Sequence, residues 1–134
     1  MNTCKNGLPE RMKAVLATRY GGSEVIQIAN VPLPAVKPGM VLVRVAASAV
    51  HSADVRTRGL QAKEPVKTLM RLALGWHRPR QLILGTVFSG TVAALGEGVT
   101  SFKVGDAVFG SSPGMRYGCH AQYAAIPASG SVAL

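Results

Sequence analysis

The stretch over residues 84–110 most limits what this 134-residue chain can fold into. Residues 86–95 alternate between two faces and are rich in β-branched side chains, which is typical of a strand largely covered on both sides. The Gly-Glu-Gly at 96–98 predicts a turn, because glycine adopts positive φ without steric cost. A polar corner at 102–106 then leads into a further short strand. This order predicts a fragment of a β-barrel.

The two glycines of that turn do not make a dinucleotide-binding fingerprint. The third glycine of the motif would fall at Ser101, and no helix follows to receive a pyrophosphate. The Gly-x-Gly pattern therefore indicates a turn.

Alternation of apolar residues predicts further strands along the rest of the chain. The clearest covers residues 41–50, where Arg44 indicates that one face is partly wet. The others are expected at 13–18, 24–31, 121–127 and from 131 onward.

Two segments favour helix. Residues 51–59 predict a loop or short helical turn that Ser52 caps. Residues 65–74 predict an amphipathic helix with Gly75 at its C-terminal end. The expected packing stripe of that helix, which is alternatively a lining of substrate space, consists of Val66, Leu69, Met70, Ala73 and Leu74.

Composition excludes several classes of protein. Hydrophobic residues make up 48% of the chain, which fits a globular domain. No apolar run approaches the roughly 18 residues that span a bilayer, and residues 1–11 are a polar, loose leader and not a signal peptide. Cys4 and Cys119 form no metal pattern or disulfide framework. The net charge of +9 leaves nucleic-acid binding as a third interpretation, but the basic window at 56–80 has only Trp76 as an aromatic.

Three motifs carry a family resemblance. They are Ile-Leu-Gly-x-x-Phe-x-Gly-x-Val at 83–92, Gly-x-Gly-Val at 96–99 and Phe-Lys-Val-Gly-Asp-x-Val at 102–108. With the opening at 12–26, they resemble the N-terminal, GroES-like catalytic domain of the medium-chain dehydrogenase/reductases, and most of all its zinc-independent quinone oxidoreductase branch. The resemblance spans residues 12–134 and implies a mainly β fold. The expected fold is a GroES-like, partly open β-barrel with one or two short helices, lacking the Rossmann domain.

The resemblance also implies that there is no zinc. Zinc-dependent members carry a cysteine after the long strand and a Gly-His-Glu segment at the central one. Here His51 holds the cysteine's place, and Gly85 is followed by Thr86 and Val87. A catalytic zinc needs about three protein ligands, so this set is too poor for one.

The implied activity is hydride transfer from NADPH to a quinone or a conjugated carbonyl, such as an enone. The sequence does not separate NADPH from NADH. The implied partners are that small-molecule substrate and a missing C-terminal Rossmann domain, with no nucleic acid and no membrane, in the cytoplasm. Because the loop that cradles the phosphates belongs to the Rossmann domain, the isolated chain is expected to be inactive and to bind cofactor weakly.

Candidate site residues follow the same resemblance. His51 and Thr86 are the catalytic candidates, and the cofactor-binding candidates are His51, Ser52, Asp54 and Arg58. The alternatives are a histidine bonded to backbone, an aspartate that caps the loop, a plain strand threonine and surface arginines. Cys119 and His120 are interpreted as structural, because neighbours on a strand point to opposite faces.

A rival hypothesis is a stand-alone GroES-like binding module or a non-catalytic fragment, because fold does not dictate function. Exposed barrel surface is also expected to make the chain self-associate.

Overall fold

The computed structural model describes residues 7–78, 82–113, 118–129 and 132–134, and its strands form two sheets. The first is an antiparallel hairpin of β1 (Arg11–Ala17) and β2 (Ile26–Pro32), joined through the short 3₁₀ turn η1 (Ser23–Val25). The second has the order β6-β3-β4-β5-β7. Its strands are β3 (Met40–Ala47), β4 (Val87–Leu95), β5 (Ala107–Ser111), β6 (Tyr123–Pro127) and β7 (Val132–Ala133). All described strand pairs are antiparallel.

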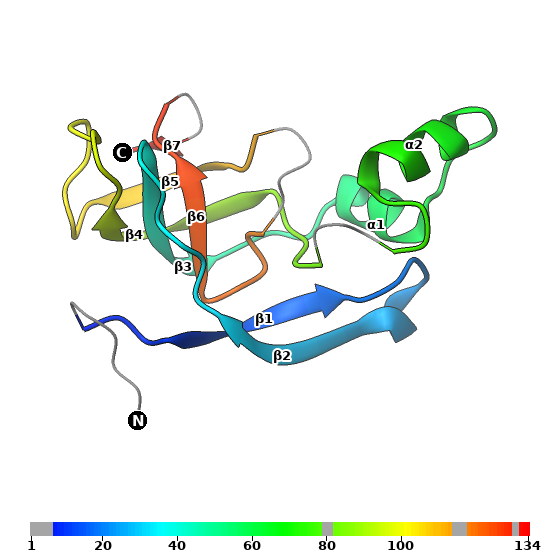
Figure 1. Ribbon diagram of the computed structural model, residues 1–134, viewed down its shortest axis with the longest axis horizontal. Helices are drawn as coiled ribbons and strands as arrows, with labels where there is room; N and C mark the ends of the chain where they lie inside the picture. The colour runs from blue at the N-terminus through cyan, green and yellow to red at the C-terminus, as the bar shows by residue number, and fades with distance from the viewer. Residues whose placement is uncertain (1–6, 79–81, 114–117, 130–131) are drawn as a thin grey trace.

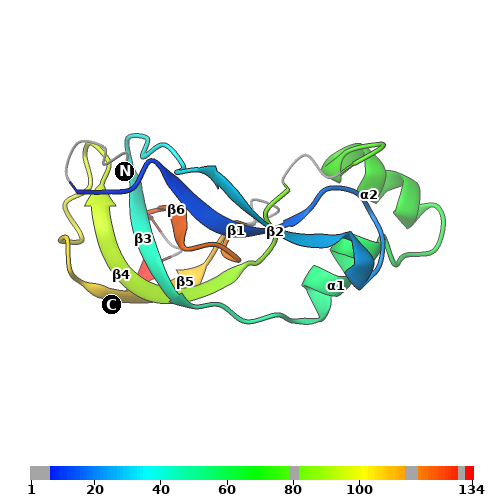
Figure 2. The ribbon, with the colours of Figure 1, turned by 90° about the horizontal axis from the view of Figure 1, so that it is seen from below.

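The five-stranded sheet curls, and the hairpin lies across its open side (Figures 1 and 2). The helices α1 (Ser52–Gly59) and α2 (Val66–Leu74) gather at one end of the molecule in both views. Of the helices in the described residues, neither is both long and apolar enough to cross a membrane. This arrangement confirms the expected mainly β, partly open barrel with two short helices.

β3 is buried on both faces because it lies between two apolar clusters. Val41 and Val43 point into the curled sheet, where they pack with residues of β4, β5 and β6. Leu42 points the other way and packs with Met12 of the hairpin and Tyr123 of β6. Arg44 and Ala46 are exposed, which agrees with the expectation that one face of this strand is partly wet, although Leu42 on the same face is buried.

The hairpin is attached to the sheet by backbone hydrogen bonds from β1. The amide of Val15 donates to the carbonyl of His120 at 2.8 Å, and that of Ala17 donates to Leu82 at 2.9 Å. The segment around 119–122 therefore lies between β1 and the end of β3, where Val45 donates to the Gln122 carbonyl.

Two details of the expected packing are wrong. β4 was expected to be largely covered on both faces, but Ser89 and Thr91 of one face are exposed, because the hairpin covers β3 and not this part of β4. In α2, Met70 and Leu74 turn toward the protein, while Val66, Leu69 and Ala73 of the expected packing stripe are exposed. The pattern identified an amphipathic helix correctly, but not the side that this chain covers.

Residues 1–6 of the expected leader lie outside the described residues. Next to them, Leu8 packs on the cluster around Leu42, and the Glu10 carbonyl accepts from Leu33 at 2.9 Å. Residues 7–11 thus contact the barrel, and the boundary at residue 12 stays a prediction.

Candidate functional site

The two catalytic candidates meet because β3 and β4 are antiparallel neighbours. Ala47, the last residue of β3, pairs with Ser89 near the start of β4, so the chain after β3 runs beside the chain before β4. Nε2 of His51 lies 2.5 Å from Oγ1 of Thr86. The hydroxyl of Ser48 donates to the carbonyl of Val87 at 2.7 Å. Sheet pairing therefore brings together the two segments that carry this ring nitrogen and this hydroxyl.

His51 is the N-cap of α1, the position that the sequence assigned to Ser52. Its backbone is extended at φ −130° and ψ 174°, and its Nδ1 accepts a hydrogen bond from the amide of Ala53 at 3.2 Å. The neutral ring therefore carries its proton on Nε2, which donates to Thr86. The Thr86 hydroxyl then has its own proton to donate to a ligand. The ring remains partly open to solvent, with 38% of the side chain exposed.

Asp54 completes the cap from inside the protein. Its Oδ2 accepts from the backbone amide of His51 at 3.1 Å, which gives the reciprocal contacts of a capping box. The side chain is only 4% exposed. This burial favours the capping alternative for Asp54 over direct contact with a cofactor.

His120, from the segment between β5 and β6, faces the same carboxylate. Its Nε2 lies 3.7 Å from Oδ2 of Asp54, and its Nδ1 lies 2.9 Å from the hydroxyl of Ser48. Gly85 makes room for this ring: its φ is +95°, and an added Cβ would lie 2.6 Å from Nδ1 of His120. The sequence interpretation of His120 as purely structural missed this contact, because the pairing of residues 119–122 along β3 has no local signature.

The other cofactor-binding candidates lie apart from this cluster. Ser52 is exposed on the first turn of α1. Arg58 is partly buried, and its Nε donates to the carbonyl of Gly21 at 3.3 Å, so it ties α1 to the loop between β1 and β2. The roles of Ser52 and Arg58 toward a cofactor stay predictions.

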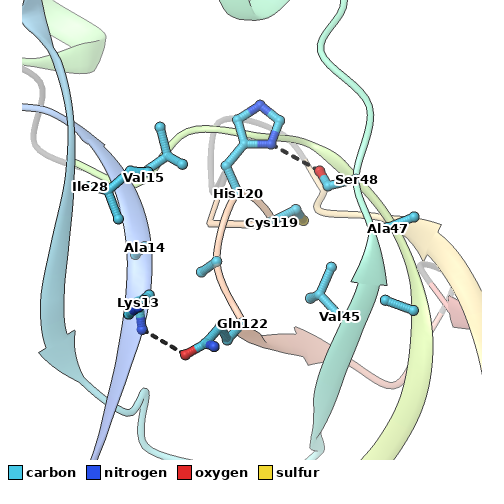
Figure 3. A pocket seen from close by; sticks show the side chains of 12 residues that line it. Lys13, Ala14, Val15, Ile28, Val45, Ala47, Ser48, Cys119, His120 and Gln122 are labelled. Carbon is cyan, nitrogen blue, oxygen red and sulfur yellow. Dashed lines mark hydrogen bonds between the residues drawn. The ribbon is translucent and has the colours of Figure 1, made fainter.

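A groove of about 400 Å³ is lined by residues of β1, of the end of β3 and of the segment 119–122 between them (Figure 3). His120 and Ser48 lie at one end of it, and Gln122 lies at the other, where its Oε1 accepts from the amide of Lys13 at 2.8 Å. Cys119 also borders the groove, but the residue is buried. Burial raises the pKa of its thiol to about 11, and the charge of Asp54 adds to this, against a hydrogen bond from the backbone of Ser112. Cys119 is therefore a thiol and not a nucleophilic thiolate at neutral pH.

No group of three or more histidine, cysteine or carboxylate side chains among the described residues is arranged to hold a metal ion. Zinc independence itself stays a prediction.

Comparison with known proteins decides the family. The alcohol dehydrogenase GroES-like domain matches residues 37–134. The chain belongs to this family. It is 34% identical over 117 residues to a quinone oxidoreductase of Sus scrofa, a match that covers 84% of this chain and 30% of the relative. It is 28% identical over 108 residues to an NADPH-dependent alkenal/one oxidoreductase of Arabidopsis thaliana, covering 80% of the chain and 25% of the relative.

Solved structures of this family agree. A mycobacterial protein in complex with NADPH superposes with a TM-score of 0.70 at 28% identity, over 92% of this chain and 34% of that one. The chain thus spans about a third or less of the length of these relatives. The resemblance to the N-terminal lobe of medium-chain dehydrogenase/reductases is confirmed.

Proposed function

We propose that this chain forms the catalytic lobe of an NADPH-dependent, zinc-independent oxidoreductase that reduces quinones or conjugated carbonyls. The observation that carries the proposal is the His51–Thr86 pair, where a ring N–H and a hydroxyl meet at a partly exposed junction of β3 and β4. The relatives named as quinone and alkenal/one oxidoreductases support it, because they share this lobe.

The pair suits the charge that such a reaction creates. NADPH supplies a hydride to the conjugated substrate, whose π-system carries the resulting negative charge onto oxygen. The Nε2–H of His51 donates to Thr86, which leaves the Thr86 hydroxyl to donate to that oxygen, and a donor aimed at developing charge lowers the barrier. Solvent at this partly exposed junction then supplies one proton to the oxygen, so the substrate gains a hydride and a proton in all.

The described residues fit one end of NADPH only. The exposed hydroxyl of Ser52 and the ring of His51 offer polar contacts for a ribose or a nicotinamide amide. The described strands pair only in antiparallel fashion, so they lack the crevice of a parallel sheet in which dinucleotide phosphates bind. We propose that a nucleotide-binding domain outside this chain holds the phosphates.

Calorimetry tests whether this chain alone can bind NADPH tightly. Titration of the chain with NADPH should give no tight binding, because the glycine-rich turn and helix N-terminus that bind the phosphates of a dinucleotide belong to the proposed nucleotide-binding domain. Submicromolar affinity for NADPH would contradict the proposal.

A chimera tests the activity. This chain replaces the matching segment, 30% of the length, in the Sus scrofa quinone oxidoreductase. The chimera should oxidise NADPH in the presence of quinones and enones. Thr86→Val should lower kcat on the order of 100-fold, as loss of an oxyanion donor does. Thr91→Val, the same change at an exposed position of β4, is the control. A folded chimera without turnover would favour a binding module.

A further inference from the structure

A closed ring of polar contacts joins the site to the groove. It runs from Thr86 to His51, on to Asp54 and His120, and back through Ser48 to the carbonyl of Val87, the neighbour of Thr86. We call this set the polar ring. Each link across it is a hydrogen bond except one, the 3.7 Å approach of His120 Nε2 to Asp54 Oδ2.

The protons of the polar ring can be assigned. The Ser48 hydroxyl has one proton, and it goes to the Val87 carbonyl at 2.7 Å. Ser48 therefore accepts from His120, so Nδ1 of His120 carries a proton. In a neutral ring, Nε2 would then present a lone pair to the carboxylate of Asp54. Two acceptors would face each other across the open link.

Burial makes that open link costly. The His120 side chain is 11% exposed and that of Asp54 is 4% exposed. Neither Nε2 of His120 nor Oδ1 of Asp54 has a hydrogen-bond partner among the described residues. A buried acceptor without a donor loses its hydrogen bonds to water and forms none within the protein, which costs free energy. A proton on Nε2 turns the same contact into a charged donor facing a carboxylate, which is a strong arrangement.

We propose that His120 is a positioning residue for His51. A proton on Nε2 of His120 holds the carboxylate of Asp54, and Asp54 holds the N-cap geometry that directs Nε2 of His51 at Thr86. The role of His51 in the reaction rests on the proposed function, but the coupling between the two histidines does not. Removal of the His120 proton releases Asp54 and loosens the His51 ring.

The groove gives His120 its own route to solvent. Its ring lines the groove of Figure 3, whereas His51 is not among the residues that line this groove. The titratable residues around His120 are Asp54 on α1, the neighbouring Cys119 and Lys13 of β1, which lines the same groove. His51 belongs to this group too, because its Nε2 lies 3.9 Å from the same Asp54 oxygen. His120 can therefore exchange its proton without passing through the site.

The test is ring ¹⁵N NMR of the whole chain as a function of pH. The sequence has three histidines, which His51→Gln, His77→Gln and His120→Gln assign one by one. We expect the ring nitrogens of His51 to show two inflections, one from their own titration and one that coincides with the titration of His120. The Nε2–H signal of His51 should also exchange with solvent faster once His120 has lost its proton.

Two substitutions of His120 separate positioning from mere packing. His120→Gln keeps an amide donor for Asp54 without titrating, so the Nε2–H form of His51 should persist and the second inflection should vanish. His120→Leu removes the donor, so His51 should become a mixture of its two neutral forms. His77→Gln, at an exposed position, should change neither signature.

Asp54→Asn should uncouple the two histidines while both still titrate. Should that variant fail to fold, as judged from its amide spectrum, Ser48→Ala replaces it as the test. This change removes the acceptor that fixes the proton on Nδ1 of His120, so a neutral His120 can keep its proton on Nε2 and the second inflection of His51 should vanish. A single inflection for His51 that is the same in the wild type and in His120→Gln would overturn the proposal. The measurement needs no NADPH and no quinone, so an inactive chimera leaves its result unaffected.

Discussion

β3 and α2 are apolar segments of similar length that differ in how far they are buried. β3 has eight residues, and its first three apolar positions after Met40 are completely buried. α2 has nine residues and an apolar face just as clear, yet only Leu74 is buried. β3 has neighbouring strands on both sides and a cluster on each face, whereas α2 is held near its end by the Tyr20 hydroxyl, which donates to Gly75. Periodicity therefore shows that a segment has an apolar face, but pairing decides whether the chain covers it.

The largest expected difference between the two segments is in the free energy of unfolding that each loses on a leucine-to-alanine substitution. Leu42→Ala in β3 should lower the free energy of unfolding by about 2–5 kcal/mol, because it leaves a cavity between two layers. Leu69→Ala in α2, where the residue is 66% exposed, should stay within about 0.5 kcal/mol. Urea unfolding of both variants measures the contrast. Equal losses would mean that the face of α2 is covered in solution.

Gly90 tests how closely the strands themselves approach. A Cβ on this residue of β4 would lie 2.0 Å from the carbonyl oxygen of Arg44 in β3, and backbone cannot rotate aside. Gly90→Ala should therefore cost about 1–3 kcal/mol in urea unfolding. Ser89→Ala, at the neighbouring exposed position, should cost little. A neutral Gly90→Ala would show that β3 and β4 separate more easily than their pairing indicates.

The buried thiol of Cys119 should make the sheet region sensitive to alkali. Because burial raises its pKa to about 11, the folded thiol stays protonated at pH 10, whereas the unfolded thiol, with an ordinary pKa near 8.5, is ionised. Stability is thus fully present below about pH 8.5 and is lost as the pH rises toward 11. At pH 10 the loss should be about 2 kcal/mol.

Cys119→Ala isolates that contribution from other titrating groups. The difference in unfolding free energy between pH 7 and pH 10 should be about 2 kcal/mol smaller in the variant than in the wild type. An identical pH dependence in the two proteins would show that the thiol is not buried in solution.

The sequence predicted those parts of the fold that local pattern determines. Alternation located β3 and β4, and Gly98, with φ at +80°, lies in the expected turn. The family resemblance named His51 and Thr86 as site candidates, but their contact follows from the pairing of β3 with β4. His120 was missed because it reaches Asp54 only through the pairing of distant strands, and nothing in Cys-His-Ala-Gln encodes that partner.

The smallest expected effect on stability lies at the contact between His51 and Thr86. Thr86→Val keeps the shape of the side chain but removes the acceptor for Nε2–H of His51. Because the ring is partly exposed, water replaces the lost partner, so the cost should be only about 0.5–1 kcal/mol. Thr91→Val, on the exposed face of β4, should cost less still.

Ring ¹⁵N shifts should reveal more than stability does at this position. The Ala53 amide still donates to Nδ1 of His51 in Thr86→Val, so the Nε2–H form should remain the major one, with a faster exchange of that proton. An unchanged exchange rate would mean that the two side chains do not meet in solution. The end of β3 would then resemble α2, because its polar side chains, like the apolar face of α2, would have no fixed partner in this chain. The His51–Thr86 pair would then no longer support the proposed function.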